Sequence, residues 1–223
     1  MQTNQISTSP SGEEFPLPTR EDYQAEFARL KALAAKQRKA GKEIVVVVGL
    51  GFVGAVMAAV VADSTDKKGR STKFVIGVQR PSTRSFWKIR LLNRGVSPVK
   101  AEDPEVEQLI ARCVNGKQTL VATYTEEALK LADVVVVDVQ CDYLKESLGN
   151  VRTGSAEMAA LEASMAAIAE NVPATALVLI ETTVAPGTTE QVAYPIMKKI
   201  FKKRGILSEP LLEIGRASCR ERV

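Results

Sequence analysis

Residues 43–54 read EIVVVVGLGFVG, an apolar run followed at once by glycines in the spacing G-x-G-x-x-G. The β-branched run predicts a buried strand, and the small residues after Gly54 predict a helix packed closely on that strand. In such a turn Gly49 allows the chain to reverse, Gly51 leaves room for a diphosphate, and Gly54 lets the helix approach the strand. The first N–H groups of the helix favour an anion. We therefore predict a dinucleotide site at Gly49, Gly51, Phe52, Val53 and Gly54, with a purely structural turn as the alternative.

The rest of the chain alternates short apolar runs with amphipathic ones. Further strands are expected at 73–78, 119–122, 133–139 and 176–181, and helices at 53–63, 85–93, 104–115, 126–131, 156–170 and 189–203. Continuous apolar strands joined by helices are typical of a parallel sheet that is covered on both faces. The predicted fold class is α/β, a Rossmann-type doubly wound parallel sheet. Its usual strand order, 3-2-1-4-5-6, needs a sixth strand, which we expect beyond Leu212.

Three segments lie outside this α/β pattern. Residues 1–18 are rich in Ser, Thr, Gln and Pro, which predicts disorder. Residues 19–41 begin with a capping box and carry one apolar face, which predicts an appended amphipathic helix. We expect this helix to pack on its own domain rather than to form a dimer contact. The dinucleotide-binding domain then covers 42–212. Residues 213–223 resemble the translation of a sequencing adapter, so we expect a non-native tail on a fragment of the natural protein.

Composition excludes several classes of function. The chain has 223 residues, a formal charge of +4 and no long run of Lys or Arg, so no nucleic-acid surface is expected. Its longest apolar stretches are far shorter than the roughly 20 residues of a membrane span. It has no histidine, which excludes Ser-His-Asp and imidazole general-base catalysis, and we expect no metal site. The three cysteines form no C-x-x-C pair, and residues 1–30 lack the apolar core of a signal peptide, so we expect a cytoplasmic location.

The second predicted strand ends without the acid that usually holds the adenosine ribose. That acid is expected roughly 20 residues beyond the glycines, but the strand is followed by Gln79, Arg80 and, further on, Arg84. Gln79 can hydrogen-bond a ribose hydroxyl, whereas Arg80 and Arg84 can receive a 2′-phosphate. NAD is the favoured cofactor, and NADP remains the alternative.

Three further motifs carry a family resemblance. They are NRGVSPV at 93–99, ADVVVVDVQCD at 132–142 and IETTVAPGTTE at 180–190. Together with the glycine turn, they make residues 42–212 resemble the N-terminal NAD-binding domain of the UDP-glucose/GDP-mannose dehydrogenase family. The resemblance implies oxidation of the C6 hydroxyl of a nucleotide-linked sugar to a carboxylate, in two hydride transfers. It also implies a nucleotide-sugar substrate, a homodimer at full length, and a catalytic cysteine in a G-F-G-G-S-C-x-P-K-D motif, helped by a lysine. The 223 residues contain no such motif.

The resemblance also implies residues for the site. Val139, Gln140 and Cys141 stand where the family reads V-P-T, so they are expected to contact the cofactor, although residues 140–142 depart from the pattern. We expect Cys141 to be a cofactor contact and not a nucleophile, because no neighbouring cation or histidine lowers its pKa. Glu181 and Thr183 follow the fifth strand and are expected to contact cofactor or substrate, with Glu181 orienting the water that hydrolyses a thioester. A purely structural turn at Thr183 is the alternative.

The first functional hypothesis is therefore the cofactor-binding part of a nucleotide-sugar 6-dehydrogenase of polysaccharide synthesis, with a slight preference for UDP-linked sugars. A related β-hydroxyacid dehydrogenase is a second hypothesis, which the segment at 182–189 disfavours. A non-catalytic dinucleotide-binding module is a third, favoured by the missing ribose acid and the altered motif at 139–142. We expect the chain alone to bind cofactor weakly without turnover, and its fifth strand to be an exposed sheet edge.

Overall fold

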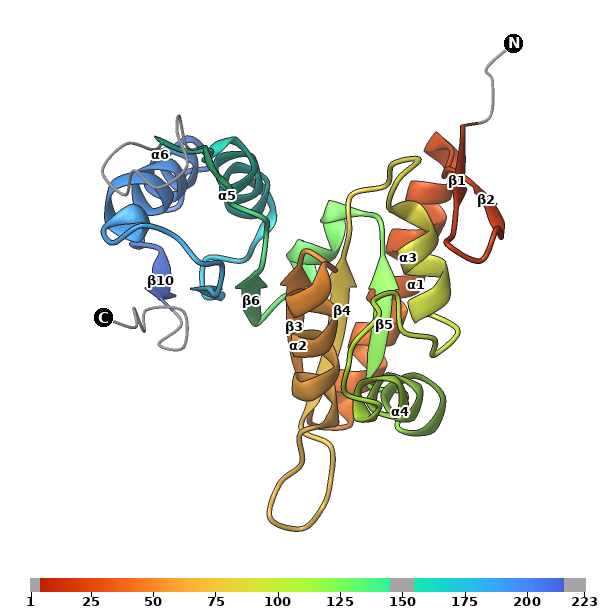
Figure 1. Ribbon diagram of the computed structural model, residues 1–223. Coiled ribbons are helices and arrows are strands. Elements are labelled where there is room, and N and C mark those ends of the chain that lie inside the picture. The colour runs from red at the N-terminus through yellow and green to blue at the C-terminus, as the bar shows by residue number, and fades with distance from the viewer. Residues whose placement is uncertain (1–4, 145–154, 215–223) are drawn as a thin grey trace.

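The computed structural model describes residues 5–144 and 155–214, and its centre is a six-stranded, fully parallel sheet (Figure 1). The strand order is β10-β9-β6-β3-β4-β5. Counted along the chain, this is the order 3-2-1-4-5-6, so the predicted Rossmann-type fold is confirmed. The strands are β3 (Glu43–Val48), β4 (Lys73–Val78), β5 (Leu120–Thr123), β6 (Val134–Val137), β9 (Leu177–Ile180) and β10 (Leu211–Ile214).

The sixth strand begins earlier than the sequence predicted. β10 pairs in parallel with β9, from Leu211 beside Leu177 to Ile214 beside Ile180. The fifth strand is therefore covered, and the expectation that it forms the sheet edge is wrong. The sequence hid β10 because its apolar run is very short and follows Pro210. Two residues of the expected tail, Glu213 and Ile214, belong to this strand, and the remainder of that tail, 215–223, lies outside the described residues.

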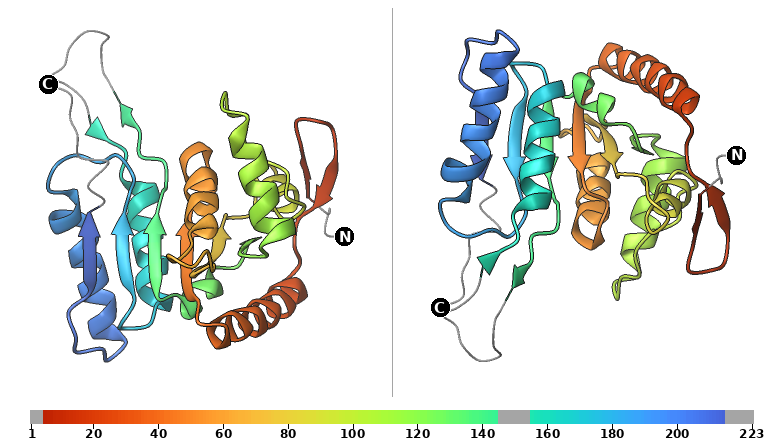
Figure 2. Two further views of the ribbon diagram at one scale, coloured as in Figure 1. Left: turned by 90° about the horizontal axis from the view of Figure 1, so that it is seen from below. Right: turned by 90° about the horizontal axis from the view of Figure 1, so that it is seen from above.

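Helices cover both faces of the sheet (Figure 2). Alternate side chains of β3 serve the two sides: Ile44 and Val46 join one apolar core, and Val45 and Val47 join the other. The first core is closed by α1 (Arg20–Lys39), the 3₁₀ helix η2 (Glu126–Leu131), α5 (Ala159–Asn171), the π-helical turn η3 (Thr189–Ala193) and α6 (Tyr194–Lys203). The second is closed by α2 (Phe52–Asp63), α3 (Phe86–Leu92), α4 (Glu105–Ala111) and the π-helical turn η1 (Arg112–Gly116).

The N-terminal segment is ordered from residue 5 onward, which corrects the predicted disorder of 1–18. β1 (Ile6–Thr8) and β2 (Glu14–Pro16) form an antiparallel hairpin. Phe15 from this hairpin is buried in the second core, and the Trp87 N–H donates to Ser7 Oγ at 3.2 Å. One buried aromatic ring, the Trp87–Ser7 hydrogen bond and an ion pair between Glu13 and Arg94 thus order a segment whose composition is that of a disordered chain. Residues 1–4 of this prediction lie outside the described part.

The appended helix α1 packs on its own domain. It begins with a capping box, in which the Thr19 N–H donates to Asp22 Oδ2 at 2.7 Å. Leu30 and Ala34 are buried in the first core, and α1 lies beside β3 and η2. Near the end of α1, Arg38 donates to Asp133 Oδ1 at 2.6 Å. These contacts join α1 to the sheet and to the loop before β6.

Two smaller features complete the described chain. β7 (Tyr143–Leu144) and β8 (Ser155–Ala156) form a short antiparallel pair. Within residues 5–144 and 155–214, every helix is too short or too polar to cross a membrane.

Candidate functional site

The turn between β3 and α2 is closed on two sides by backbone atoms. Gly49 has a φ of +101°, and a Cβ placed on it would lie 2.0 Å from the carbonyl oxygen of Asp138. A Cβ placed on Gly54 would lie 2.0 Å from the carbonyl oxygen of Gly49. A real side chain at either position would displace the main chain of β3, α2 or the end of β6. These two glycines are therefore required by packing, before any ligand is considered.

Gly51 is different, because a Cβ placed there would meet no atom within 4 Å. It is the N-cap of α2, and its φ of −72° is accessible to any residue. The helix leaves the N–H groups of Phe52 and Val53 without acceptors inside α2. The side chains of these two residues are 61% and 54% exposed. This open approach to unpaired N–H groups at the positive end of a helix fits the diphosphate of a dinucleotide.

Beside the turn lies a crevice of about 320 Å³, at the carboxyl ends of the strands. The neighbouring strands β3 and β6 continue into segments on opposite faces of the sheet, so the crevice lies at the point where the strand order reverses. In doubly wound folds this is where ligands bind. One wall comes from α5, through small residues such as Ala160 and Ser164. The complete lining is Val48, Gly49, Gly51, Val78, Gln79, Arg80, Lys88, Glu126, Leu129, Asp138, Val139, Gln140, Ala160, Ser164, Ala167 and Ile168.

The structure brings together most of the residues predicted for cofactor binding. Those that line the crevice are Gly49, Gly51, Gln79, Arg80, Val139 and Gln140, and three more follow in the first turn of α2, namely Phe52, Val53 and Gly54. The other four predicted residues lie neither in the crevice lining nor in this turn: Arg84 and Thr183, which are exposed, and Cys141 and Glu181, which are half-buried.

Gln79 supports the glycine turn. Its side-chain Oε1 accepts a hydrogen bond from the Leu50 N–H at 2.9 Å, and its backbone N–H donates to the Thr123 carbonyl at the end of β5. The Gln79 side chain, which is expected to hydrogen-bond a ribose hydroxyl, therefore also holds the glycine turn in place. Its side-chain nitrogen, Nε2, is left to donate to a ligand.

Arg80, just after β4, has an acidic partner in the crevice. Its Nη2 lies 3.7 Å from Glu126 Oε1, and both residues line the crevice. Sequence reasoning missed Glu126, although its position three residues after β5 was a usable signal: the end of β5 is next to the end of β4 in the predicted sheet.

Asp138 is a second residue that sequence reasoning missed. It follows β6 directly, lines the crevice, and its carboxylate lies beside the backbone of Gly54. Its Oδ2 lies only 2.7 Å from where a Cβ of Gly54 would be. Burial raises the pKa of the Asp138 carboxyl above its ordinary value, and the nearby Gly54 N–H opposes this rise only in part.

The loop after β6 is held by Thr182, which is 5% exposed. Thr182 Oγ1 accepts from the Val139 N–H at 2.9 Å and lies 2.8 Å from the Val139 carbonyl oxygen, to which it can donate. The Glu181 N–H donates to the Val137 carbonyl at 3.0 Å. The ETT segment thus ties the end of β9 to the wall of the crevice.

Cys141 has the chemistry of a thiol rather than a thiolate. Burial, and in second place the nearby Asp142 carboxylate, raise its pKa above the ordinary value. A raised pKa disfavours the nucleophilic form, as the sequence led us to expect.

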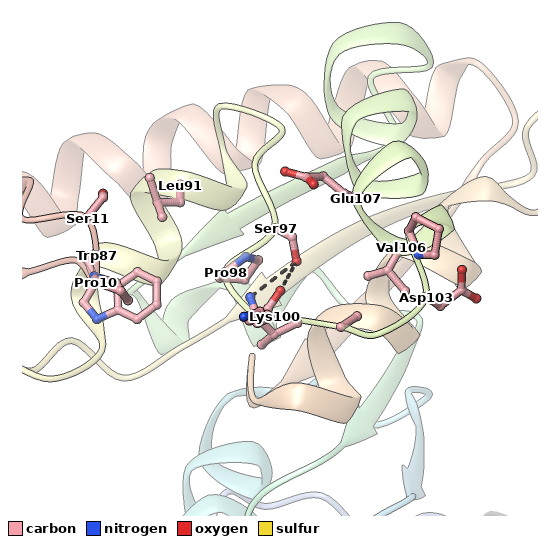
Figure 3. Close-up of a pocket in the computed structure, with 13 residues that line it drawn as sticks. Pro10, Ser11, Trp87, Leu91, Ser97, Pro98, Lys100, Asp103, Val106 and Glu107 are labelled. Carbon is pink, nitrogen blue, oxygen red and sulfur yellow. Dashed lines mark hydrogen bonds between the residues drawn. The ribbon is translucent and has the colours of Figure 1, made fainter.

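The NRGVSPV motif lies outside the crevice and joins neighbouring elements of the fold. Asn93 Nδ2 donates to the Ala122 carbonyl at 2.8 Å, and Asn93 Oδ1 accepts from the Ala122 N–H at 2.7 Å, so α3 is tied to β5. Ser97 and Pro98 line a separate pocket of about 360 Å³, with Trp87 and Lys100 among its other walls (Figure 3). This pocket shares no lining residue with the crevice.

The doubly wound sheet, with a glycine turn at the point where its strand order reverses, defines a dinucleotide-binding Rossmann domain. Residues 43–223 match the family described as "UDP-glucose/GDP-mannose dehydrogenase family, NAD binding domain". Since the match covers more than half of the chain, the chain belongs to this family, and the resemblance seen in the sequence is confirmed. The members of the family are NAD-dependent dehydrogenases.

Solved structures agree with this family. NDP-N-acetyl-D-galactosaminuronic acid dehydrogenase from Methanosarcina mazei Go1 is 27% identical, with a TM-score of 0.64 over 83% of this chain and 36% of that one. UDP-D-ManNAc dehydrogenase from Pyrococcus horikoshii is 25% identical, with a TM-score of 0.55 over 77% of this chain and 35% of that one. GDP-mannose dehydrogenase from Pseudomonas aeruginosa, in a ternary complex, shares the fold at 24% identity, with a TM-score of 0.58 over 76% and 34%.

The chain therefore spans about a third of the length of these dehydrogenases. A search of the curated proteins gives no match.

Proposed function

We propose that this chain is the NAD-binding part of a nucleotide-sugar 6-dehydrogenase, which oxidises the C6 hydroxyl of a UDP-linked sugar to a carboxylate for polysaccharide synthesis. The observation that carries the proposal is the contrast within the glycine turn. Backbone atoms occupy the Cβ positions of Gly49 and Gly54, whereas the Cβ position of Gly51 is open and beside the crevice. Because this empty Cβ position borders the crevice, it leaves the room that a ligand needs to approach the backbone closely.

In this proposal the chain's own residues bind and orient. The Phe52 and Val53 N–H groups hold the diphosphate, and Gln79 holds the turn in the shape that presents them. Bound NAD would supply the hydride acceptor. Val139, Gln140 and Cys141 would face the nicotinamide end, and Glu181 would orient the water that hydrolyses a thioester. By family resemblance, the cysteine that captures the aldehyde belongs to the G-F-G-G-S-C-x-P-K-D motif and therefore to a part of the enzyme outside these 223 residues.

The crevice favours NAD over NADP. Arg80 and Arg84 suggested a 2′-phosphate site, but the Glu126 carboxylate is 3.7 Å from the Arg80 guanidinium and lines the same crevice. It offsets the charge of Arg80 and would repel a 2′-phosphate, while accepting a hydrogen bond from a 2′-hydroxyl. We expect Glu126→Gln to narrow the preference for NAD in calorimetric titrations with both cofactors. A large NADP preference that is lost in Arg80→Ala would contradict this assignment.

The test of the proposal is Gly51→Ala. The new methyl group meets no protein atom, so the free energy of unfolding should fall by no more than about 1 kcal/mol, as for an alanine in place of a better N-cap. NAD affinity in calorimetric titration should fall at least about 10-fold, because the methyl group occupies the diphosphate position. The matched control is Gly116→Ala in η1, which also adds a Cβ into open space. Equal NAD affinity in both variants would contradict the proposal.

We also propose a homodimer for the full-length enzyme, by family resemblance, and a cytoplasmic setting. Cys113 and Cys141 are free thiols, which fits a reducing compartment. The alternative of a β-hydroxyacid dehydrogenase loses its support through the family match.

A further inference from the structure

The proposed function uses neither of two charged side chains in the crevice, Asp138 and Lys88, and Asp138 is the one beside the glycine turn. Asp138 has its carboxylate beside the first turn of α2, with Oδ2 2.7 Å from where a Cβ of Gly54 would be. The same helix end supplies the Phe52 and Val53 N–H groups that would hold a diphosphate. A fixed negative charge therefore lies next to the position proposed for two further negative charges.

Apart from the positive end of α2, little in the surroundings of Asp138 offsets its negative charge. Among the described residues no Lys or Arg forms an ion pair with its carboxylate. The charged groups that share the crevice are Arg80, Lys88 and Glu126, and Arg80 is already paired with Glu126. The Asp138 N–H donates to the Val48 carbonyl at the end of β3, and the Asp138 carbonyl oxygen lies against Gly49. The next residue, Val139, donates its N–H to Thr182 Oγ1. None of these neighbours carries a charge.

From this geometry we infer that Asp138 sets the affinity for the coenzyme by charge: the crevice binds NAD with Asp138 protonated and opposes it with Asp138 ionised. The inference rests on the proposed function, because it takes NAD as the ligand. Like charges close together in a partly buried site disfavour one another, so the diphosphate and the ionised carboxylate compete for the same helix end. Binding of NAD is then coupled to uptake of one proton by the Asp138 carboxyl.

The sign of the pH dependence follows. Burial raises the pKa of Asp138, so the carboxyl is neutral below that pKa and ionised above it. The window therefore lies above the ordinary aspartate pKa of about 4. As the pH rises through this window, the affinity for NAD should fall, and a second negative ligand such as ADP-ribose should show the same trend.

The experiment compares the unmodified chain with Asp138→Asn by calorimetric titration of NAD between pH 5 and pH 8.5. Asparagine keeps the shape of the side chain and removes its charge. We expect the affinity of the unmodified chain to fall about 10-fold over this range, and that of Asp138→Asn to change less than about 2-fold and to be tighter at pH 8.5. The matched control is Asp142→Asn, an exposed acid on the same loop but outside the crevice lining, which should keep the pH dependence.

Proton uptake gives a second measurement that needs no variant. Titrations of the unmodified chain in two buffers with different ionisation enthalpies should reveal a proton taken up with NAD. Equal affinity and equal pH profiles for the unmodified chain and Asp138→Asn would overturn the inference and leave the proposed function intact. Weaker binding by Asp138→Asn would also overturn it, because Asp138 would then hold the coenzyme. Absence of NAD binding in every variant, with the fold verified by thermal melting, would instead overturn the proposed function.

Discussion

At the scale of single residues, the three glycines of the turn perform two different tasks. Gly49 and Gly54 are closed in by backbone oxygen atoms, and Gly51 borders open space. The sequence pattern predicted a role for each, because the spacing G-x-G-x-x-G is tied to a strand, a turn and a helix. It did not predict Asp138 or Thr182, whose roles depend on how the ends of β6 and β9 meet the turn. That meeting is set by strand register, which a single sequence does not display.

The residue-scale prediction is Gly54→Ala. The new Cβ would lie 2.0 Å from the Gly49 carbonyl oxygen and 2.7 Å from Asp138 Oδ2, and the Gly49 backbone cannot yield without moving β3 or α2. We expect the free energy of unfolding to fall by about 3 kcal/mol, at the upper end of overpacking effects. Denaturant unfolding followed by circular dichroism measures this. Gly51→Ala is the same substitution three residues earlier. A similar loss of stability in both variants would contradict the conclusion that Gly54 is required by packing and Gly51 is not.

At the scale of elements, the sequence located the first five sheet strands within two residues at each end. It did so because their Val- and Ile-rich runs are bounded by polar residues and turns. The helix predicted at 104–115 is α4 followed by the π-helical turn η1, and the helix predicted at 189–203 starts with the π-helical turn η3. Hydrophobic spacing does not distinguish such turns from regular α-helix, because one added residue per turn hardly alters which face is apolar.

The element-scale prediction concerns Asp63, at the last residue of α2. Its carboxylate accepts from Arg112 Nε and Nη2, each at 3.0 Å, and lies 2.7 Å from Lys117 Nζ. These two cations hold the pKa of Asp63 well below its usual range, and so the end of α2 is fastened to η1 and to the loop after it. A negative charge at a helix C-terminus is otherwise unfavourable.

Because the folded-state pKa of Asp63 is depressed, its contribution is present above the unfolded-state pKa of about 4 and disappears as the pH falls through the folded-state value. We expect Asp63→Asn to lower the free energy of unfolding by about 1 kcal/mol at pH 7, after allowance for solvent screening, and by less at pH 3. Urea unfolding at both pH values measures this. The control is Glu107→Gln, an exposed acid of α4, which should change stability by less than about 0.5 kcal/mol. A loss for Asp63→Asn that is equal at both pH values would exclude the ion-pair explanation.

At the scale of the whole molecule, the fold class followed from the alternation of strands and helices, whereas both ends of the described chain were mispredicted. The hairpin β1–β2 is ordered by Phe15 and its contacts with α3, and β10 by pairing with β9. In both cases tertiary contacts order a segment whose local sequence is weak, and such contacts are invisible to propensity and composition.

The whole-molecule prediction concerns activity. We expect the purified 223-residue chain to bind NAD and to form no uronate from UDP-glucose. The chain has no histidine, Cys141 has a raised pKa, and the cysteine motif that the family resemblance implies is not in the sequence. Absorbance of NADH at saturating NAD and UDP-glucose, followed by mass spectrometry of the sugar product, measures this. Steady formation of a UDP-uronate would show that the catalytic groups are present after all.

The hydrogen bond between Gln79 and the Leu50 N–H ties the turn to its neighbouring strand whether or not a guest is present. A preorganised binding site loses little conformational entropy when the ligand binds, so less of the interaction free energy is spent on ordering the turn. Removing this hydrogen bond should therefore make the entropy of NAD binding less favourable, even though Gln79 does not have to touch the diphosphate itself.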